Sequence, residues 1–115
     1  MKVHKLNISA AKDNLETLKD NSYKNNRRSG ILLVESLNNV RKFQQHTRDD
    51  LDSDNPEWAS EELLTEISTV IGMLTGIKKQ SKSKEISGSY GVTVGINILE
   101  CIHILENIQE DINKN

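Results

Sequence analysis

Aromatic residues, cysteine and proline are scarce in this chain of 115 residues. It has one Cys, one Pro, one Trp, one Phe and two Tyr. A single cysteine cannot form an internal disulfide, which excludes the class of small proteins that are held together by disulfides. The hydrophobic content is 35%, so a core must be built mainly from Ile, Leu and Val. A chain of this length fits one domain.

Long apolar runs and phosphate-binding loops are also missing. No apolar run approaches the roughly 20 residues that a helix needs to cross a bilayer. The N-terminal residues 1–6 lack the apolar stretch of a secretory signal. The glycines at 88, 91 and 95 do not follow a strand as a phosphate-binding loop requires. We therefore expect a cytoplasmic protein with no membrane partner and no cofactor.

Charge is distributed unevenly, although the net charge is only −2. Residues 1–48 carry ten basic and four acidic side chains, and residues 78–84 contain four lysines. Between them, residues 49–77 carry eight carboxylates and no Lys or Arg. Two interpretations follow: oppositely charged helices face each other in the fold, or the acidic segment binds a basic partner.

Apolar residues recur at steps of three and four in four segments, which indicates four amphipathic helices. The apolar positions are Ile8, Ala11, Leu15, Leu18; Leu33, Leu37, Val40, Phe43; Leu63, Ile67, Val70, Leu74, Ile77; and Ile98, Ile102, Leu105, Ile108, Ile112. The predicted fold class is all-α, a single-domain antiparallel bundle of about four helices over residues 8–22, 29–47, 56–79 and 92–112. A flexible polar linker is predicted over residues 78–91.

The third helix has the strongest start signal. Asp54 or Asn55 is the expected cap, and Pro56 suits the first helical position because its missing N–H has no helical partner there. Within this helix, Gly72 and Gly76 predict a close approach by another backbone, since each glycine weakens a helix by about 1 kcal/mol.

The ends of the other helices are less clearly marked. Asn7 or Ser9 is the expected cap of the first helix, and Ser29 that of the second. Residues 90–98 alternate in the manner of a strand, but the chain has no second strand to pair with them. We therefore predict helix there.

A calcium loop is the first chemical hypothesis for the acidic segment. Asp50, Asp52, Asp54 and Glu61 occupy positions 1, 3, 5 and 12 of an EF-hand loop. A helix that begins at Pro56 carries Glu61 away from the aspartates, however. We favour a capped, solvated acidic turn and expect no metal site.

Catalysis has one concrete candidate. Arg41 and His46, which have four residues between them in an all-helical domain, resemble the Arg-x4-6-His signature of the HEPN ribonucleases. The resemblance covers residues 41–46 only, and Lys42 stands where that family commonly has a polar Asn, Asp or His. It implies a dimer in which Arg41 and His46 of two protomers meet and act on RNA. The alternative is a solvated helix end whose cations complement the helix dipole.

Three further patterns are weaker. Glu100 and His103 form one Glu-x-x-His half of a di-iron site, but the chain has no second half. Cys101 and His103 lie about 200° apart on a helix, so they cannot act as a catalytic pair.

Basic clusters at 24–28 and 78–84 could touch phosphates. Aromatic residues do not interleave them, and we do not expect nucleic acid as the main partner.

The leading hypothesis is a small non-enzymatic helical protein that binds another protein. Inhibitors, immunity proteins, antitoxins, phage proteins and accessory regulators are of this kind. The predicted partner-binding residues are Asp50, Asp52, Asp54, Glu57, Trp58, Glu61 and Glu62. They would form an acidic face, with Trp58 as apolar anchor, for an unidentified protein with a basic surface. The alternatives are the HEPN-like ribonuclease, a homo-oligomer (a homodimer being the simplest) that uses the 63–77 seam or the Gly72/Gly76 face, and a nucleic-acid-binding accessory protein.

Overall fold

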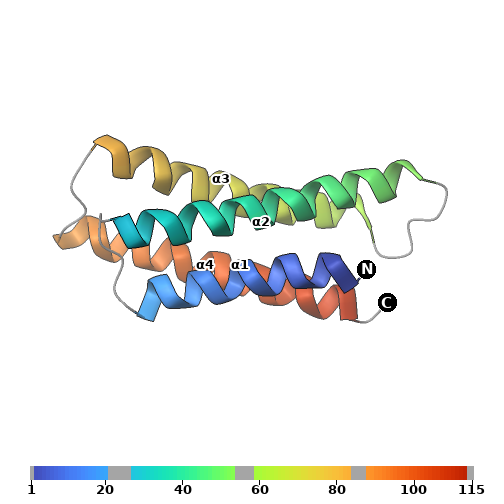
Figure 1. The fold of residues 1–115 in the computed structure, drawn as a ribbon, viewed down its shortest axis with the longest axis horizontal. Helices are drawn as coiled ribbons and strands as arrows, with labels where there is room; N and C mark the ends of the chain where they lie inside the picture. Colours follow the sequence, from blue (N-terminus) through green and yellow to red (C-terminus); the bar gives the residue numbers. More distant parts are fainter. Residues whose placement is uncertain (1, 21–26, 54–58, 84–87, 114–115) are drawn as a thin grey trace.

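The structure is a computed structural model that describes residues 2–20, 27–53, 59–83 and 88–113. It consists of four helices, α1 (Lys2–Asp20), α2 (Arg27–Asp52), α3 (Glu61–Ser83) and α4 (Gly88–Asn113) (Figure 1). The all-α prediction is confirmed. Residues 90–98 lie within α4, and no strand occurs among the described residues.

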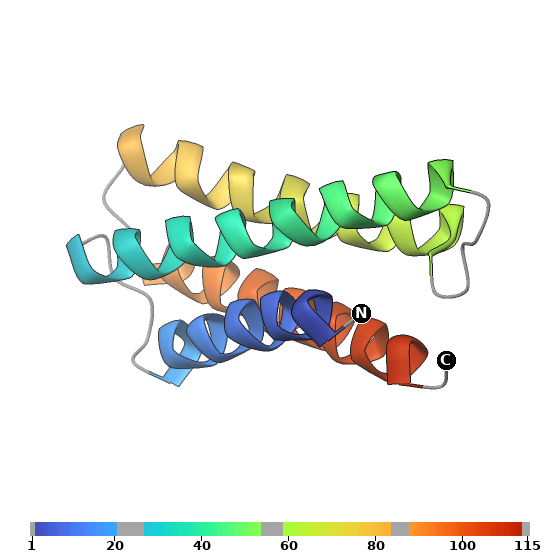
Figure 2. The same ribbon diagram turned by 45° about the vertical axis from the view of Figure 1, so that its right-hand side comes forward.

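The helices form an up-and-down antiparallel bundle of 48 × 22 × 20 Å. Helix α1 contacts α2 and α4, and α3 contacts the same two neighbours, so the four helices occupy the corners of a square. The chain reverses direction at each connection, and both termini lie at one end of the bundle (Figures 1 and 2). The end of α2 and the start of α3 lie at that same end.

The core is an aliphatic seam that runs the length of the bundle. On α4, Val94, Ile98, Cys101, Leu105 and Ile108 are buried at alternating steps of four and three, the period of a coiled-coil seam. Each fully buried Leu or Ile contributes about 1.5–3 kcal/mol through removal of apolar surface from water. All the apolar positions predicted from the sequence are buried.

Two buried polar side chains of α2 are satisfied by its own backbone. Ser36 donates to the carbonyl oxygen of Leu32 at 2.8 Å, and Thr47 donates to that of Phe43 at 2.8 Å. These bonds let α2 present hydroxyl groups to the core without a buried unpaired donor, which would cost about 1–3 kcal/mol.

The predicted start of the third helix is wrong. Ala59 and Ser60 are not helical, and α3 begins at Glu61. Ser60 is the cap: its Oγ accepts from the backbone N–H of Leu63 at 3.0 Å. This bond satisfies one of the N–H groups that lack a helical partner. The expected caps at 54 and 55, and Pro56 itself, lie outside the described residues.

Other helices are longer than predicted. Helix α1 begins by Lys2, so Asn7 and Ser9 lie inside it, and Ser29 likewise lies inside α2. Helix α2 continues through Asp52 instead of ending near residue 47. The predicted linker over 78–91 is shorter, because α3 runs to Ser83 and α4 starts at Gly88.

The close approach predicted at Gly72 and Gly76 is not present within the described part of the chain. A Cβ added at either glycine would meet nothing within 4 Å. The seam over 63–77 is buried in the chain's own core, so it is not free for a homo-oligomer. Gly72 stays exposed on the outer side of α3.

Candidate functional site

Carboxylates from three helices gather at the end of the bundle that holds both chain termini. We call this the acidic end, and it comprises Asp49, Asp50, Asp52, Glu61, Glu62, Glu66 and Asp111. The first three lie in the last turns of α2, the next three lie in the first turns of α3, and Asp111 lies in the last turn of α4. Figures 1 and 2 show these three helix ends together.

The acidic residues of α2 and α3 have opposite relations to their helix dipoles. Glu61 and Glu62 lie in the first turn of α3, where negative charge is favourable. The last turn of α2 carries no basic residue but contains Asp49, Asp50 and Asp52, where negative charge is unfavourable. Ser53 caps this end, since its Oγ donates to the carbonyl oxygen of Asp50 at 2.6 Å. The end of α2 is thus held by a local cap while carrying negative charge that the helix dipole disfavours.

Repulsion within the acidic end is visible at Glu66. Burial raises the pKa of its carboxyl above the ordinary value of 4.5, and the negative charges of Asp111 and Glu62 raise the pKa further. One carboxyl oxygen, Oε2, is buried and has no hydrogen-bond partner in the structure as described. The acidic groups of α3 and α4 are therefore close enough to repel one another.

The predicted partner-binding residues fall into three groups. Glu61 and Glu62 are exposed at the start of α3, as expected. Asp50 and Asp52 belong to the end of α2 instead of the entry to α3, and Asp52 is exposed whereas Asp50 is half-buried. The remaining three, at 54, 57 and 58, lie outside the described residues.

The structure adds acidic residues that the sequence did not assign to the partner-binding face. Asp49 and Glu66 both belong to the acidic segment over residues 49–77 but not to the predicted face, and Asp111 lies 45 residues beyond Glu66. Only the alignment of α3 with α4 brings Asp111 beside Glu66. The helical period of α4 alone does not predict that Asp111 lies beside Glu66, because the packing of the core sets how far α4 is shifted along α3.

The calcium-loop hypothesis conflicts with the backbone. Asp50 and Asp52 are helical and lie two residues apart, so their side chains point about 200° apart around the helix axis. They cannot converge on one ion as positions 1 and 3 of a loop do. No group of three His, Cys, Asp or Glu residues suited to a metal occurs among the residues that could be searched.

Arg41 and His46 both lie on α2, well before its end at Asp52. Arg41 is exposed and His46 is half-buried. Five residues along a helix turn the side-chain direction by about 140°, so the two do not form one cluster within a protomer. The ribonuclease activity that the family resemblance implies stays a prediction.

The Glu100–His103 segment shows no activated group. Glu100 and His103 are exposed on α4, while Cys101 is buried. Burial, together with the nearby charge of Glu100, raises the pKa of the Cys101 thiol to about 12. Its Sγ lies 3.8 Å from the Sδ of Met73 in the core. A thiol with this pKa is protonated at neutral pH and is a poor nucleophile.

Comparison of the chain with protein-family models, with curated proteins and with solved structures found no match. No helix in the described ranges is long and apolar enough to cross a membrane.

Proposed function

We propose that this chain acts by binding another protein that presents a basic surface, and that the acidic end is its docking surface. Inhibition, immunity or antitoxin activity, or accessory regulation, would follow from covering that basic surface. The observation that supports the proposal is the negative charge that α2, α3 and α4 gather at one end of the bundle. Repulsion of this kind costs free energy in the free protein and is relieved when a cationic partner docks.

The raised pKa of Glu66 links binding of a basic partner to pH. Burial raises the pKa of Glu66 and the charges of Asp111 and Glu62 raise it further, whereas the cations of a partner would lower it. In the pH range in which Glu66 ionises, binding therefore releases part of a proton, and the affinity rises with pH over that range. Complementary charge of this sort acts mainly on association rate and partner choice.

A lysine-rich peptide of about ten residues serves as the probe, since its charge represents the basic surface. The test variant carries Asp52→Asn, Glu61→Gln and Glu62→Gln, all at exposed positions of the acidic end. Three exposed charge contacts together contribute about 2 kcal/mol, so the variant should bind roughly thirty-fold more weakly by calorimetry at low salt.

The matched control removes three exposed carboxylates elsewhere with Asp13→Asn, Glu35→Gln and Glu100→Gln. Both triple variants change the net charge equally, so a difference between them isolates position from total charge. The control should bind within about threefold of the wild type. Equal weakening of both variants, or wild-type binding too weak to measure, would contradict a docking role for the acidic end.

A further inference from the structure

One long side of the bundle is lined by cations of α2 and α3. We call this the basic face, and it comprises Arg27, Arg41, Arg48, Lys78 and Lys79. In residues 27–48 and 63–79 together, seven Lys and Arg stand against two carboxylates, which gives a net charge of +5. No carboxylate of the described chain lies within 4.0 Å of a basic-face cation.

The fold places these cations on one side. Gln44 of α2 donates to the hydroxyl of Ser68 of α3 at 3.1 Å, which identifies the side of α2 that faces α3. Arg41 and Arg48 lie three residues before and four residues after Gln44, so they share that side. Lys79 follows Ser68 by eleven residues, which is three helical turns, and so lies along the same line of α3.

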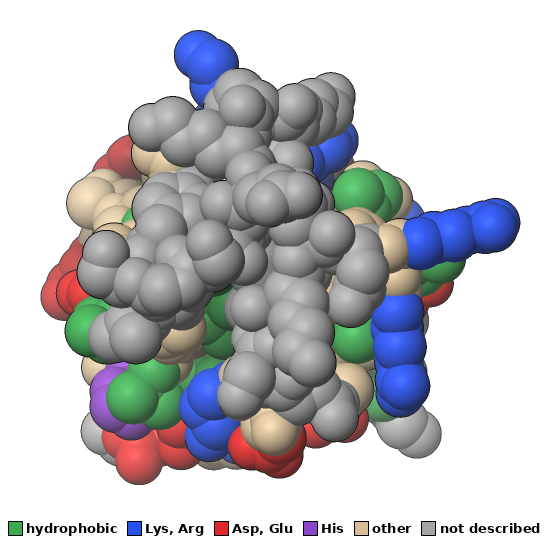
Figure 3. Space-filling model, turned by 90° about the vertical axis from the view of Figure 1, so that its left-hand side faces the viewer, with side chains coloured by type: hydrophobic (Ala, Val, Ile, Leu, Met, Phe, Trp, Pro, Cys, Tyr) green, Lys and Arg blue, Asp and Glu red, His purple; other side chains and the backbone are tan. Residues whose placement is uncertain are grey.

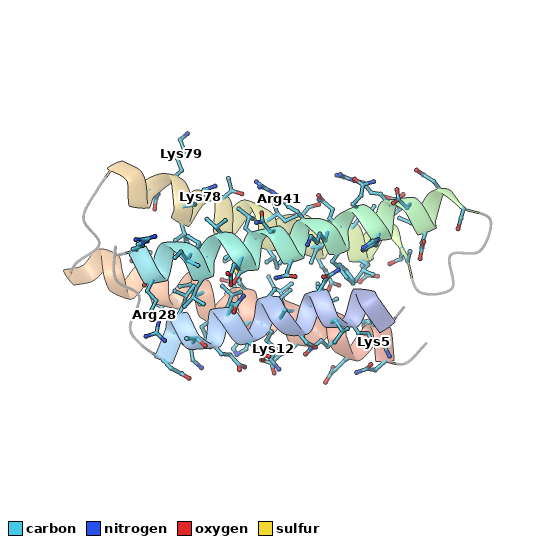
Figure 4. All side chains as sticks on the ribbon, in the orientation of Figure 1. Lys5, Lys12, Arg28, Arg41, Lys78 and Lys79 are labelled. Atoms are coloured by element: carbon cyan, nitrogen blue, oxygen red, sulfur yellow. The ribbon has the colours of Figure 1, made fainter. Side chains whose placement is uncertain are left out.

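Figure 4 shows Arg41, Lys78 and Lys79 on the α2–α3 side, whereas Lys5 and Lys12 project from α1 at the opposite edge. Figure 3, which looks at the end of the bundle remote from the acidic end, shows Lys and Arg side chains projecting from its top and right edges. Arg27, Arg41 and Arg48 are separated by multiples of seven residues, which makes a nearly straight line with about 10 Å per heptad.

The two carboxylates within these segments do not neutralise the basic face. Glu66 precedes Ser68 by two residues, so the two side chains point about 160° apart around α3. Glu35 precedes Arg41 by six residues and therefore lies about 120° away around α2. The face thus presents positive charge interrupted only by small or uncharged side chains. Exposed residues of this kind are Asn38, Gln45, Ser68, Gly72 and Thr75.

We propose that the basic face binds the phosphodiester backbone of a nucleic acid without reading its sequence. Phosphate contacts need only cations and polar hydrogen-bond donors along a line, which this face supplies. The basic clusters at 24–28 and 78–84 could touch phosphates from the sequence alone, but Arg41 and Arg48 join the lysines of α3 only in the folded chain.

An acidic protein is the other polyanion that could meet this face. Protein interfaces are built around a desolvated apolar or aromatic centre. Of the four exposed large hydrophobic residues in the described part of the chain, Leu6, Ile96 and Leu99 lie on α1 and α4, and Ile31 lies near the start of α2. The stretch from Asn38 to Arg48 has no such centre, which favours a nucleic acid.

The test measures fluorescence anisotropy of a labelled oligonucleotide of about 20 nucleotides, single-stranded in one arm and duplex in the other, from about 50 to 200 mM salt. Contact with four phosphates predicts a slope of log affinity against log salt near −3 for the single strand and steeper for the duplex. The double variant Arg41→Gln/Lys78→Gln should weaken binding at least about tenfold and make the slope shallower by about 1.5.

The control is Lys5→Gln/Lys12→Gln, which removes the same charge from the opposite edge (Figure 4). It should change the affinity by less than about threefold. Circular dichroism checks that each variant is folded. If Arg41→Gln/Lys78→Gln is not folded, Lys79→Gln, at an exposed site, replaces it as the test variant. The proposal is overturned if the wild type does not bind at the lowest salt, if test and control weaken binding equally, or if a glutamate-rich peptide binds more tightly than either oligonucleotide.

Discussion

Replacing Ser60 by Ala should destabilise the protein, because Ser60 is the cap that fixes where α3 begins. Its Oγ accepts from the N–H of Leu63 at 3.0 Å, and its carbonyl accepts from the N–H of Leu64 at 3.1 Å. The substitution removes only the first of these bonds, and Ser60 is exposed, so no core packing is lost. An N-cap serine contributes about 1 kcal/mol relative to alanine.

This magnitude converts into a measurable shift in melting temperature. A chain of 115 residues has an unfolding entropy of about 0.24 kcal/mol/K, so 1 kcal/mol lowers Tm by about 4 °C. Thermal unfolding followed by circular dichroism at 222 nm gives the value directly. Ser60→Asp is the control, because aspartate also caps and favours the helix dipole, and it should restore most of the loss. An unchanged Tm in Ser60→Ala would refute Ser60 as the cap. It would indicate that the start signal of α3 lies nearer to Pro56 in the sequence.

Three further predictions concern stability and reactivity. Glu66→Gln should be more stable than the wild type at pH 7 by about 0.5 kcal/mol. The advantage should vanish below pH 4.5, because the raised pKa of Glu66 costs stability only once the carboxyl ionises in the unfolded chain. Urea unfolding at pH 7 and below pH 4.5 measures the difference. Gly72→Ala should raise the free energy of unfolding by about 0.5–1 kcal/mol, since a Cβ at this exposed helical site meets nothing within 4 Å; a loss of stability would reveal a contact at that site. Cys101, with its pKa raised to about 12, should react with a thiol reagent at pH 8 only as fast as the protein unfolds, and immediate labelling in native buffer would contradict its burial.

The sequence predicted the helices and their buried faces well, because burial in a bundle follows the 3.6-residue period. Phe43 is an example. Its place in the helical period of α2 predicted burial, and its side chain is fully buried. Ile31 shows the limit. It is apolar and lies within the predicted second helix, yet its side chain is 49% exposed. A period fixes the direction of a side chain but leaves open how far a neighbouring helix extends to cover it.

The acidic site was less predictable because it depends on contacts between helices. Pro56 and Ser60, four residues apart, are two competing signals for the start of the third helix. Local propensity alone did not decide between them. Asp50 and Asp52 lie at the end of α2, instead of on the approach to α3, because α2 continues through Asp52. Asp111 joined the site through the packing of α4 on α3, which no local pattern reports.

Docking of a basic partner at the acidic end is tested most directly by a two-dimensional amide NMR titration with a lysine-rich peptide. The proposal predicts that the largest shift changes fall in residues 49–53 and 59–66 and near Asp111, while the amides of Asp13, Glu35 and Glu100 move little. The Glu66 carboxyl resonance should also titrate at a lower pH in the complex, because the partner's cations favour its charged form. Shift changes spread evenly over all exposed carboxylates, or concentrated at the opposite end of the bundle, would contradict the proposal.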